Sequence, residues 1–132
     1  MCAKVLLLNP PSKHGVAVVR DTLYGCWCKG RANYMWPPLG LLYVGATLRK
    51  YGHEPVLLDS AALRHSVEDA VKKAVKEKPD YVVVNTATIT FSNDAGVVKK
   101  LKEELPETGS IFLARTWESC RRSPLRRKEW TT

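Results

Sequence analysis

The stretch Lys4-Val5-Leu6-Leu7-Leu8-Asn9-Pro10-Pro11 is the best indicator of the fold. Its four aliphatic residues form a short apolar run that stops at Asn9-Pro10-Pro11, a pattern typical of a buried β-strand. A second proline pair, Pro37-Pro38, precedes an amphipathic segment that ends at Tyr51-Gly52-His53. A strand that leads into a helix in this way predicts the first unit of an α/β sheet.

The segment between this strand and this helix is where we expect function. The 25 residues from Ser12 to Trp36 far exceed the few that usually connect a strand to a helix. They follow the carboxyl end of the first strand, and open parallel sheets bind their ligands at that edge. The sequence therefore predicts a ligand site where this long loop begins and ends.

The apolar residues after Pro38 predict a well-buried first helix. They recur at the spacing of one helical face, and Gly52 lies where a helix end favours a left-handed residue. The residues that we expect to face the core are Leu39, Leu42, Tyr43 and Ala46, with Leu41, Val44 and Leu48 widening the stripe.

The rest of the chain alternates strands and helices at intervals of roughly 30 residues, as parallel sheets with helical crossovers do. The expected elements are a strand over Glu54–Asp59, a helix capped by Ser66 with Val67, Ala70, Val71, Ala74 and Val75 inward, a strand over Tyr81–Val84 that exits through Asn85–Thr88, a helix from about Asn93, and a strand over Ile111–Ala114. The predicted fold class is α/β: a Rossmann-like or flavodoxin-like doubly wound parallel sheet of about four strands with flanking helices. We expect this domain to cover residues 1–114 and a basic, irregular tail to cover residues 115–132.

Length and composition set further limits. With 132 residues, of which 45% are hydrophobic, the chain is long enough for one domain with a real core. We find no apolar stretch of the roughly 18 residues that a membrane span needs, nor the pattern of a signal peptide, and therefore expect a cytoplasmic protein without a membrane partner. The four cysteines do not resemble a secreted disulfide framework, so we expect free thiols.

The formal charge of +8 raises the question of nucleic-acid binding. Half of the excess lies in one short segment, because Arg115 to Thr132 contains six basic and two acidic residues. The remaining basic residues are scattered, largely as lysines on predicted helix faces, which is typical of a solvated surface. Nucleic acid is therefore an unlikely partner.

The turns after the strands exclude three common kinds of site in such sheets. Asn9-Pro10-Pro11 replaces the glycines that a dinucleotide site needs for close backbone approach to a pyrophosphate. The same turn lacks the Gly-Lys-Ser/Thr signature of a P-loop. A receiver-type phosphorylation domain needs acidic residues after its first strand and an Asp at the end of the third, and here Asn85 stands there.

Several motifs in order resemble the N-terminal cobalamin-binding domain of B12-dependent radical SAM proteins. The resemblance runs from about Lys4 to Leu113. The motifs that carry it are Lys4–Pro11, Pro37-Pro38-Leu39-Gly40-Leu41-Leu42-Tyr43-Val44, Tyr51–Pro55, Leu57-Leu58-Asp59 and Pro79-Asp80-Tyr81-Val82-Val83-Val84.

The resemblance implies a corrinoid (cobalamin) held over the carboxyl edge of the sheet, with its nucleotide tail in the domain. It implies a backbone wall at Asn9, Pro10 and Pro11, a helix start at Pro38, Leu39 and Gly40, and hydrogen-bonding groups at Asn85, Thr86, Ala87 and Thr88. Other B12 domains carry an Asp-x-His-x-x-Gly motif whose His binds cobalt. This chain has only His14 nearby, so we expect cobalt without a protein histidine.

The C-terminus departs from the family pattern. After the fourth strand the family has a Gly-rich loop, a further strand and a helix, whereas this chain has Ala114-Arg115-Thr116-Trp117 and an arginine-rich ending. Because the codons of Ser119–Trp130 can be respelled in a neighbouring frame in the family's style, truncation or a frame shift after about Leu113 is one interpretation. A natural divergent tail is the other. A lost strand would leave an exposed sheet edge open to self-association.

The resemblance implies an accessory domain rather than an enzyme in its own right. Its partner would be a radical SAM barrel, with methyl transfer as the reaction of the full-length protein. The cysteine motif of that barrel is absent here, so we expect no iron–sulfur cluster on this chain, and Cys26-Trp27-Cys28 is too sparse to predict a metal site. Trp27, Tyr34 and Trp36 either cover a macrocycle or anchor the loop. The alternative function is a cofactor-free flavodoxin-like module that contacts a protein or nucleic acid through its basic tail.

Overall fold

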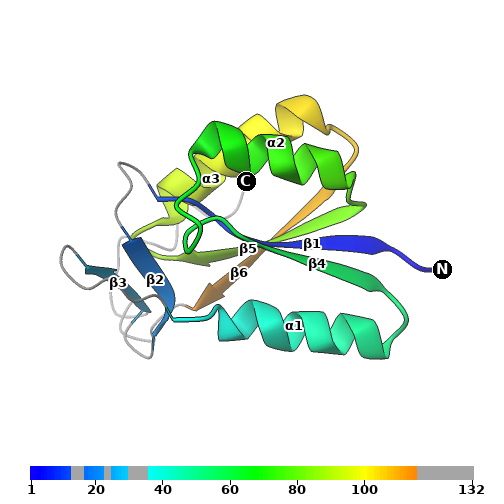
Figure 1. Ribbon diagram of the computed structural model, residues 1–132, viewed down its shortest axis with the longest axis horizontal. Coiled ribbons are helices and arrows are strands. Elements are labelled where there is room, and N and C mark those ends of the chain that lie inside the picture. The colour runs from blue at the N-terminus through cyan, green and yellow to red at the C-terminus, as the bar shows by residue number, and fades with distance from the viewer. Residues whose placement is uncertain (13–16, 23–24, 30–35, 116–132) are drawn as a thin grey trace, which may run out of the picture.

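The computed structural model describes residues 1–12, 17–22, 25–29 and 36–115 (Figure 1). The elements alternate much as predicted. In chain order they are β1 (Lys4–Asn9), β2 (Ala17–Thr22), β3 (Gly25–Lys29), α1 (Leu39–Lys50), β4 (Glu54–Asp59), α2 (Val67–Glu77), β5 (Tyr81–Ala87), α3 (Phe91–Glu104) and β6 (Gly109–Arg115).

The main sheet has four strands in the order β4-β1-β5-β6, and every pair is parallel. β1 and β5 lie at the centre, which explains why their runs are apolar on both faces. Leu6 of β1 is opposite Val56 of β4 and Val82 of β5. The predicted fold class, an α/β doubly wound parallel sheet with flanking helices, is confirmed.

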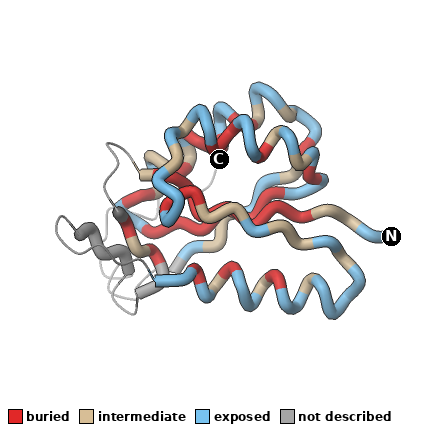
Figure 2. Tube along the Cα trace, viewed as in Figure 1, coloured by how far each residue is buried: buried red, intermediate tan, exposed pale blue. Residues whose placement is uncertain are grey.

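Helices cover the two faces of the sheet unequally. α2 and α3 lie side by side on one face, and α1 lies on the other (Figure 1). The core under α2 and α3 contains Leu6, Leu8, Val82 and Val84, together with Val97 and its helical neighbours. The core under α1 is smaller and contains Val5, Leu7, Leu41 and Val83. Buried residues therefore concentrate along β1 and β5 (Figure 2).

The expected buried face of α1 was wrong in part. Leu41 is buried, and Val44 and Leu48 pack against the core, as predicted. Leu39, Leu42, Tyr43 and Ala46 are exposed, with 46% of Leu39 and 73% of Tyr43 open to solvent. Besides Leu41, the helix turns Gly45 inward. Gly45 explains the difference, because a Cβ on it would lie 2.8 Å from Leu7 Cδ1. The helix backbone approaches the sheet closely at a residue that an apolar count overlooks.

The signals at the helix ends were correct. The Ser66 hydroxyl accepts a hydrogen bond from the Asp69 amide at 3.0 Å and caps α2. Gly52, after α1, has a positive φ of 83°, as its predicted role requires. The inward face of α2 consists of the five residues predicted for it. Ala70, Val71 and Ala74 are buried, and Val67 and Val75 are partly buried against the same core.

Two boundaries differ near the carboxyl edge. β5 continues through Asn85–Ala87, which were expected to form a loop, and α3 begins at Phe91 rather than at about Asn93. β6 supplies the reason for the longer strand, because Asn85, Thr86 and Ala87 each have a parallel partner there.

The long segment after β1 is not simply a loop. It contains the antiparallel hairpin of β2 and β3, a separate two-stranded sheet that pairs Val18 with Cys28. Residues 12–36 were expected to form one long loop, and no strand was predicted there. The hairpin lies at the end of the main sheet where the parallel strands finish (Figure 1).

A surface ion pair ties the start of β1 to the end of α2. Lys4 Nζ lies 2.8 Å from Glu77 Oε2. This hydrogen bond lowers the pKa of Glu77 and raises that of Lys4, because it favours the charged form of each.

Several predictions fall outside the described residues. They concern His14, Tyr34, the side chains of Cys26, Trp27 and Cys28, and the tail from residue 116 onward. Cys2 is a free, exposed cysteine. None of the helices in the described part of the chain combines the length and apolar character that crossing a membrane requires.

The close approach of α1 to the sheet is testable with two matched substitutions. Gly45→Val should lower the free energy of unfolding by about 1–3 kcal/mol, because Leu7 is buried and cannot move aside freely. Gly96→Val in α3 has no neighbour within 4 Å and should change it by less than about 0.5 kcal/mol. Urea denaturation of both variants measures this, and equal effects would contradict the packing described for α1.

Candidate functional site

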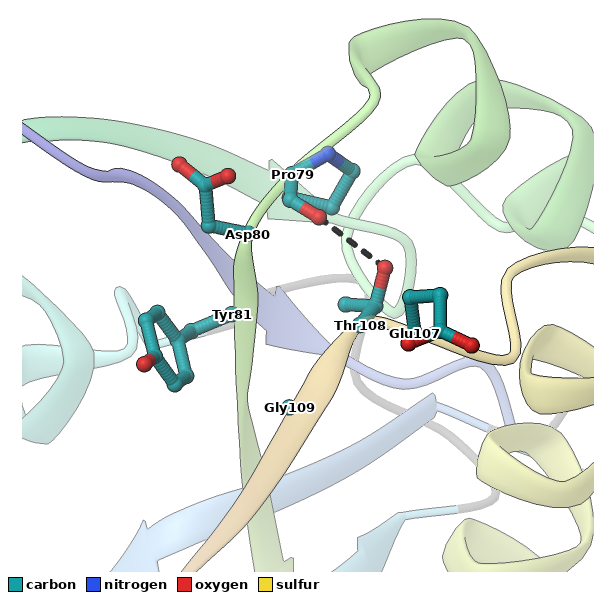
Figure 3. A pocket seen from close by; sticks show the side chains of 6 residues that line it. All are labelled: Pro79, Asp80, Tyr81, Glu107, Thr108 and Gly109. Carbon is teal, nitrogen blue, oxygen red and sulfur yellow. Dashed lines mark hydrogen bonds between the residues drawn. The ribbon is translucent and has the colours of Figure 1, made fainter.

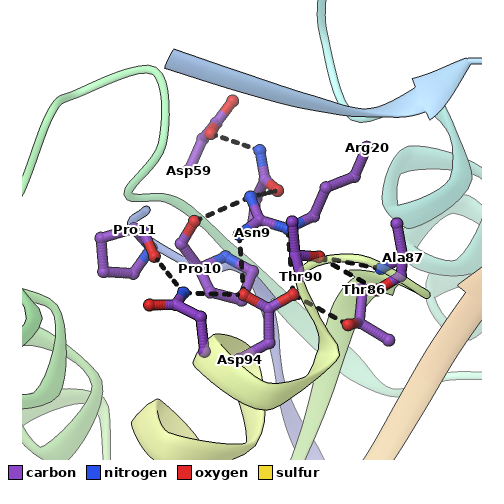
Figure 4. A network of polar contacts seen from close by, with 10 residues as sticks. Asn9, Pro10, Pro11, Arg20, Asp59, Thr86, Ala87, Thr90 and Asp94 are labelled. Atoms are coloured by element: carbon purple, nitrogen blue, oxygen red, sulfur yellow. Dashed lines mark hydrogen bonds and ion pairs between the residues drawn. The ribbon is translucent and has the colours of Figure 1, made fainter. Parts of the chain in front are cut away.

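The carboxyl ends of the central strands form a polar rim. β1 ends at Asn9 and β5 ends at Ala87. In a doubly wound sheet this is the edge where ligands bind. The rim in this protein is occupied by a hydrogen-bonded network of buried side chains (Figure 4).

Arg20 of β2 is at the centre of this network. Its Nε donates to Asp94 Oδ2 at 3.1 Å and its Nη2 to Asp94 Oδ1 at 2.7 Å, so that the two side chains form a bidentate pair. Both side chains are 0% exposed. Arg20 Nη1 also donates to the Pro10 carbonyl at 3.0 Å and reaches Asn9 Oδ1 at 3.5 Å. The guanidinium therefore joins the hairpin to the ends of β1 and α3.

The Asp94 carboxylate has two further donors. Thr86 Oγ1 donates to Oδ2 at 2.8 Å, and Asn93 Nδ2 approaches Oδ1 at 3.1 Å. Asn93 Nδ2 also donates to the Pro11 carbonyl at 3.0 Å. These bonds offset the cost of removing the carboxylate from water.

A second branch of the network extends toward β4. Asn9 Nδ2 donates to Asp59 Oδ1 at 2.8 Å, and the same oxygen accepts the Ala62 amide at 3.1 Å. A chain of hydrogen bonds thus links the ends of β4, β1 and β5. It runs from Asp59 to Asn9, then to Arg20, and through Asp94 to Thr86.

The structure brings most of the expected site residues to this rim. The buried members of the expected site are Asn9, Pro10, Pro11, Pro38, Asn85, Thr86 and Ala87. Gly40 is half-buried, and Leu39 and Thr88 are exposed. Pro38 is the residue before α1, as expected. The Thr86 hydroxyl is already engaged with Asp94, and the Ala87 amide donates to Thr90 Oγ1 at 3.1 Å.

The two faces of the sheet differ at the rim. Side chains alternate along β5, so Val82, Val84 and Thr86 face α2 and α3, whereas Val83 and Asn85 face α1. The Arg20–Asp94 network closes the α3 side. Among the described residues, this network leaves the α1 side of the rim uncovered.

An apolar groove of about 410 Å³ lies on that side, between α1 and strands β1, β5 and β6, and it extends to Ala3, His53 and Tyr81 at the amino ends of the strands. Its position follows from the single helix on this face, which leaves β6 uncovered by any described element. Val83 forms its floor, and Ile111 is 54% exposed. The lining residues are Ala3, Val5, Val44, Leu48, His53, Tyr81, Val83, Ile111, Phe112 and Leu113.

A second hollow, of about 360 Å³, lies at the opposite edge of the sheet (Figure 3). It surrounds the first residues of β5 and β6, where Thr108 Oγ1 donates to the Pro79 carbonyl at 3.0 Å. The amino ends of parallel strands are not the edge where such sheets bind ligands. We therefore do not assign it to the site.

A chain of Ser60, His65 and Lys73 follows β4. Lys73 Nζ lies 2.6 Å from His65 Nε2, and His65 Nδ1 lies 3.3 Å from Ser60 Oγ. An ammonium group only donates, so Nε2 is the acceptor and Nδ1 carries the proton. His65 then donates to Ser60 and cannot act as its base. Among the described residues, no three His, Cys, Asp or Glu side chains gather into a potential metal site.

Sequence reasoning missed Arg20, Asn93 and Asp94. Arg20 directly follows the apolar run Val16-Ala17-Val18-Val19, and an arginine at the end of an apolar run does not by itself indicate burial. Asp94 lies in the first turn of α3, where an acidic residue is ordinary. Nothing local connects two residues that are 74 positions apart.

Removing the negative charge of Asp94 should strongly destabilise the domain. Asp94→Asn keeps the shape but leaves the Arg20 cation buried without a counter-charge, which costs about 3–5 kcal/mol. Glu68→Gln is the control, because Glu68 pairs with Lys100 at 2.8 Å on the surface, where both side chains are more than half exposed. We expect that control to lose less than about 1 kcal/mol. Urea denaturation measures both, and a loss below 1 kcal/mol in Asp94→Asn would contradict the buried pair.

The comparison with known proteins agrees with the observed fold. The sequence profile of the B12 binding domain matches residues 28–112, a stretch that includes α1, the strands β4 and β5, both α2 and α3, and most of β6. No curated protein and no solved structure matches the chain significantly. The match covers more than half of the 132 residues. The chain therefore belongs to the B12 binding domain family.

Proposed function

We propose that this domain binds cobalamin, with the corrin over the carboxyl rim and the nucleotide tail in the apolar groove beside α1. The observation that carries the proposal is this groove, open on the one face of the sheet that the Arg20–Asp94 network does not close. Family membership supports corrinoid binding in general, and the groove supports this particular arrangement.

The groove suits the aromatic base of a nucleotide tail. Its volume of about 410 Å³ lies within the range of small-molecule sites, and its lining is mainly aliphatic. α1 begins at the rim and has no acidic residue in its first turn. The positive end of its helix dipole would favour the phosphate of the tail.

We propose a cobalt ion without a protein histidine ligand, as the resemblance implies; His14 lies outside the described residues, and the other two histidines are engaged within the domain. His65 has both ring nitrogens within hydrogen-bond distance of Ser60 or Lys73. His53 Nδ1 accepts the Ala3 amide at 3.3 Å and lies just before β4, at the amino edge of the sheet. The polar side chains at the rim would hydrogen-bond the amide groups of the corrin.

We infer that the domain serves a larger radical SAM enzyme that transfers a methyl group. Support comes from the ordered motifs between Lys4 and Leu113 and from the exposed apolar stripe of α1, which offers a surface to another domain.

We propose a shifted reading frame as the origin of the tail after about Leu113. Reading the coding sequence beyond that codon in all three frames tests it. A cytoplasmic location agrees with the free thiol of Cys2.

Cobalamin binding is the direct test. Protein mixed with hydroxocobalamin and then desalted should retain the corrin absorbance. Ile111→Lys, in the groove wall, should weaken binding about tenfold or more, because an ammonium group would need to be desolvated beside the bound base.

Leu57→Lys is the matched control for Ile111→Lys. Leu57 lies on the other edge strand, is 42% exposed, and pairs with Leu7 on the same face, yet it does not line the groove. It should leave the affinity unchanged. Equal losses in both variants would argue against the groove. A colourless wild-type protein that shifts RNA in a salt-dependent manner would favour the alternative of a cofactor-free module.

We also propose that the outer edge of β6 permits self-association. No described strand pairs with that edge, and an open edge is a template for another strand. Light scattering after size-exclusion chromatography should detect a concentration-dependent dimer. Lysines at the exposed positions Ser110 and Ala114 should abolish it, and a monomer at all concentrations would refute it.

A further inference from the structure

Three side chains of the β2–β3 hairpin are described: Val18, Val19 and Arg20. The hairpin forms its own two-stranded sheet and adds no strand to the main one. Of the hairpin residues whose side chains are described, Val18 and Arg20 are buried. Val18 contributes apolar contact, which has little directionality. Among the described side chains of the hairpin, Arg20 is therefore the one that can fix its orientation.

The receptor for Arg20 belongs entirely to the main domain. Asp94 is held by Thr86 of β5 and by Asn93 of α3, and Asn93 also holds the chain after β1 through the Pro11 carbonyl. The Pro10 carbonyl completes the set of acceptors. The acceptors are thus fixed by bonds that do not involve the hairpin, and they match the fork of a guanidinium (Figure 4).

Stability alone does not account for this pair. Burying a guanidinium and a carboxylate costs nearly as much as their attraction returns, and apolar residues of similar size often give equal stability. What the pair adds is direction: two bonds to Asp94 and one to Pro10 define the plane of the guanidinium. The pair is placed at the rim, where the corrinoid is proposed to bind.

We propose that Arg20 is a positioning residue that docks the hairpin against the rim, so that the docked hairpin forms a wall of the cofactor site. The inference rests on the proposed function. The hairpin lies across the ends of the strands beside the start of α1 (Figure 1). A corrin over the rim, as proposed above, would lie against the hairpin. Docking of the hairpin and binding of cobalamin are therefore coupled.

Two variants separate docking from folding. Arg20→Lys keeps the positive charge beside Asp94 but cannot make the bidentate contact. Arg20→Met combined with Asp94→Leu removes both charges and leaves no unpaired ion in the core. Arg20→Lys supplies the answer if the double variant does not fold.

Hydrogen exchange measures docking without any cofactor. In both variants the amides of β2 and β3 should exchange about tenfold faster or more, while those of β1 and β5 keep their protection. Hydroxocobalamin affinity should fall about tenfold or more in the same proteins. A purely structural role would instead change protection throughout the main sheet.

Two results would overturn the proposal: unchanged protection of the hairpin amides in a folded variant, or a hairpin that loses protection without any loss of cobalamin affinity. Wild-type protein that binds no cobalamin would overturn the proposed function, and with it the role of Arg20 in the cofactor site. The exchange measurement would still decide whether Arg20 docks the hairpin.

Discussion

Placing an arginine cation out of water at the end of a parallel sheet constrains everything around it. The Arg20 guanidinium needs a counter-charge and several acceptors at fixed positions, and these come from the end of β1 and the first turn of α3. The end of β5 adds the Thr86 hydroxyl, which donates to Asp94. Asp94 provides the charge, and Thr86 and Asn93 hold it in place. Because each partner would be costly to leave unsatisfied in the interior, the rim has essentially one arrangement. The polar rim is thus as much a part of the core as the aliphatic residues below it.

This network also explains why the two faces of the sheet have different uses. On the side of α2 and α3, two helices and the Arg20–Asp94 pair fill the space to the end of β5. On the other side, α1 covers mainly β1 and β4 and leaves the apolar face of β5 and β6 open as a groove. A doubly wound sheet normally buries both faces. The uncovered part is therefore the place where a ligand or another element gains most by binding.

Much of the fold followed from local signals. The apolar run before Asn9 and the run after Asp80 could only be buried strands, and the Ser66 cap and Gly52 marked helix ends through the backbone conformations that those residues favour. The face of α1 did not follow. Two apolar stripes share that helix, and the choice between them depends on how closely Gly45 approaches Leu7. The general behaviour of parallel sheets predicted the edge of the candidate site, whereas the hydrogen bonds among its residues were not foreseen.

The sequence by itself determined the order of strands and helices around the main parallel sheet and predicted the edge at which function should lie, because hydrophobic periodicity, prolines and glycines act within a few residues of one another. Only the tertiary structure decided that the segment after β1 folds back as a hairpin, that Arg20 meets Asp94, and that one face of the rim is closed while the other opens into a groove. These features depend on residues far apart in the chain, and a pairing between a cation and a carboxylate at that separation has no local signature. The chain must first bring β1, β5 and α3 together before the acceptors for that cation exist.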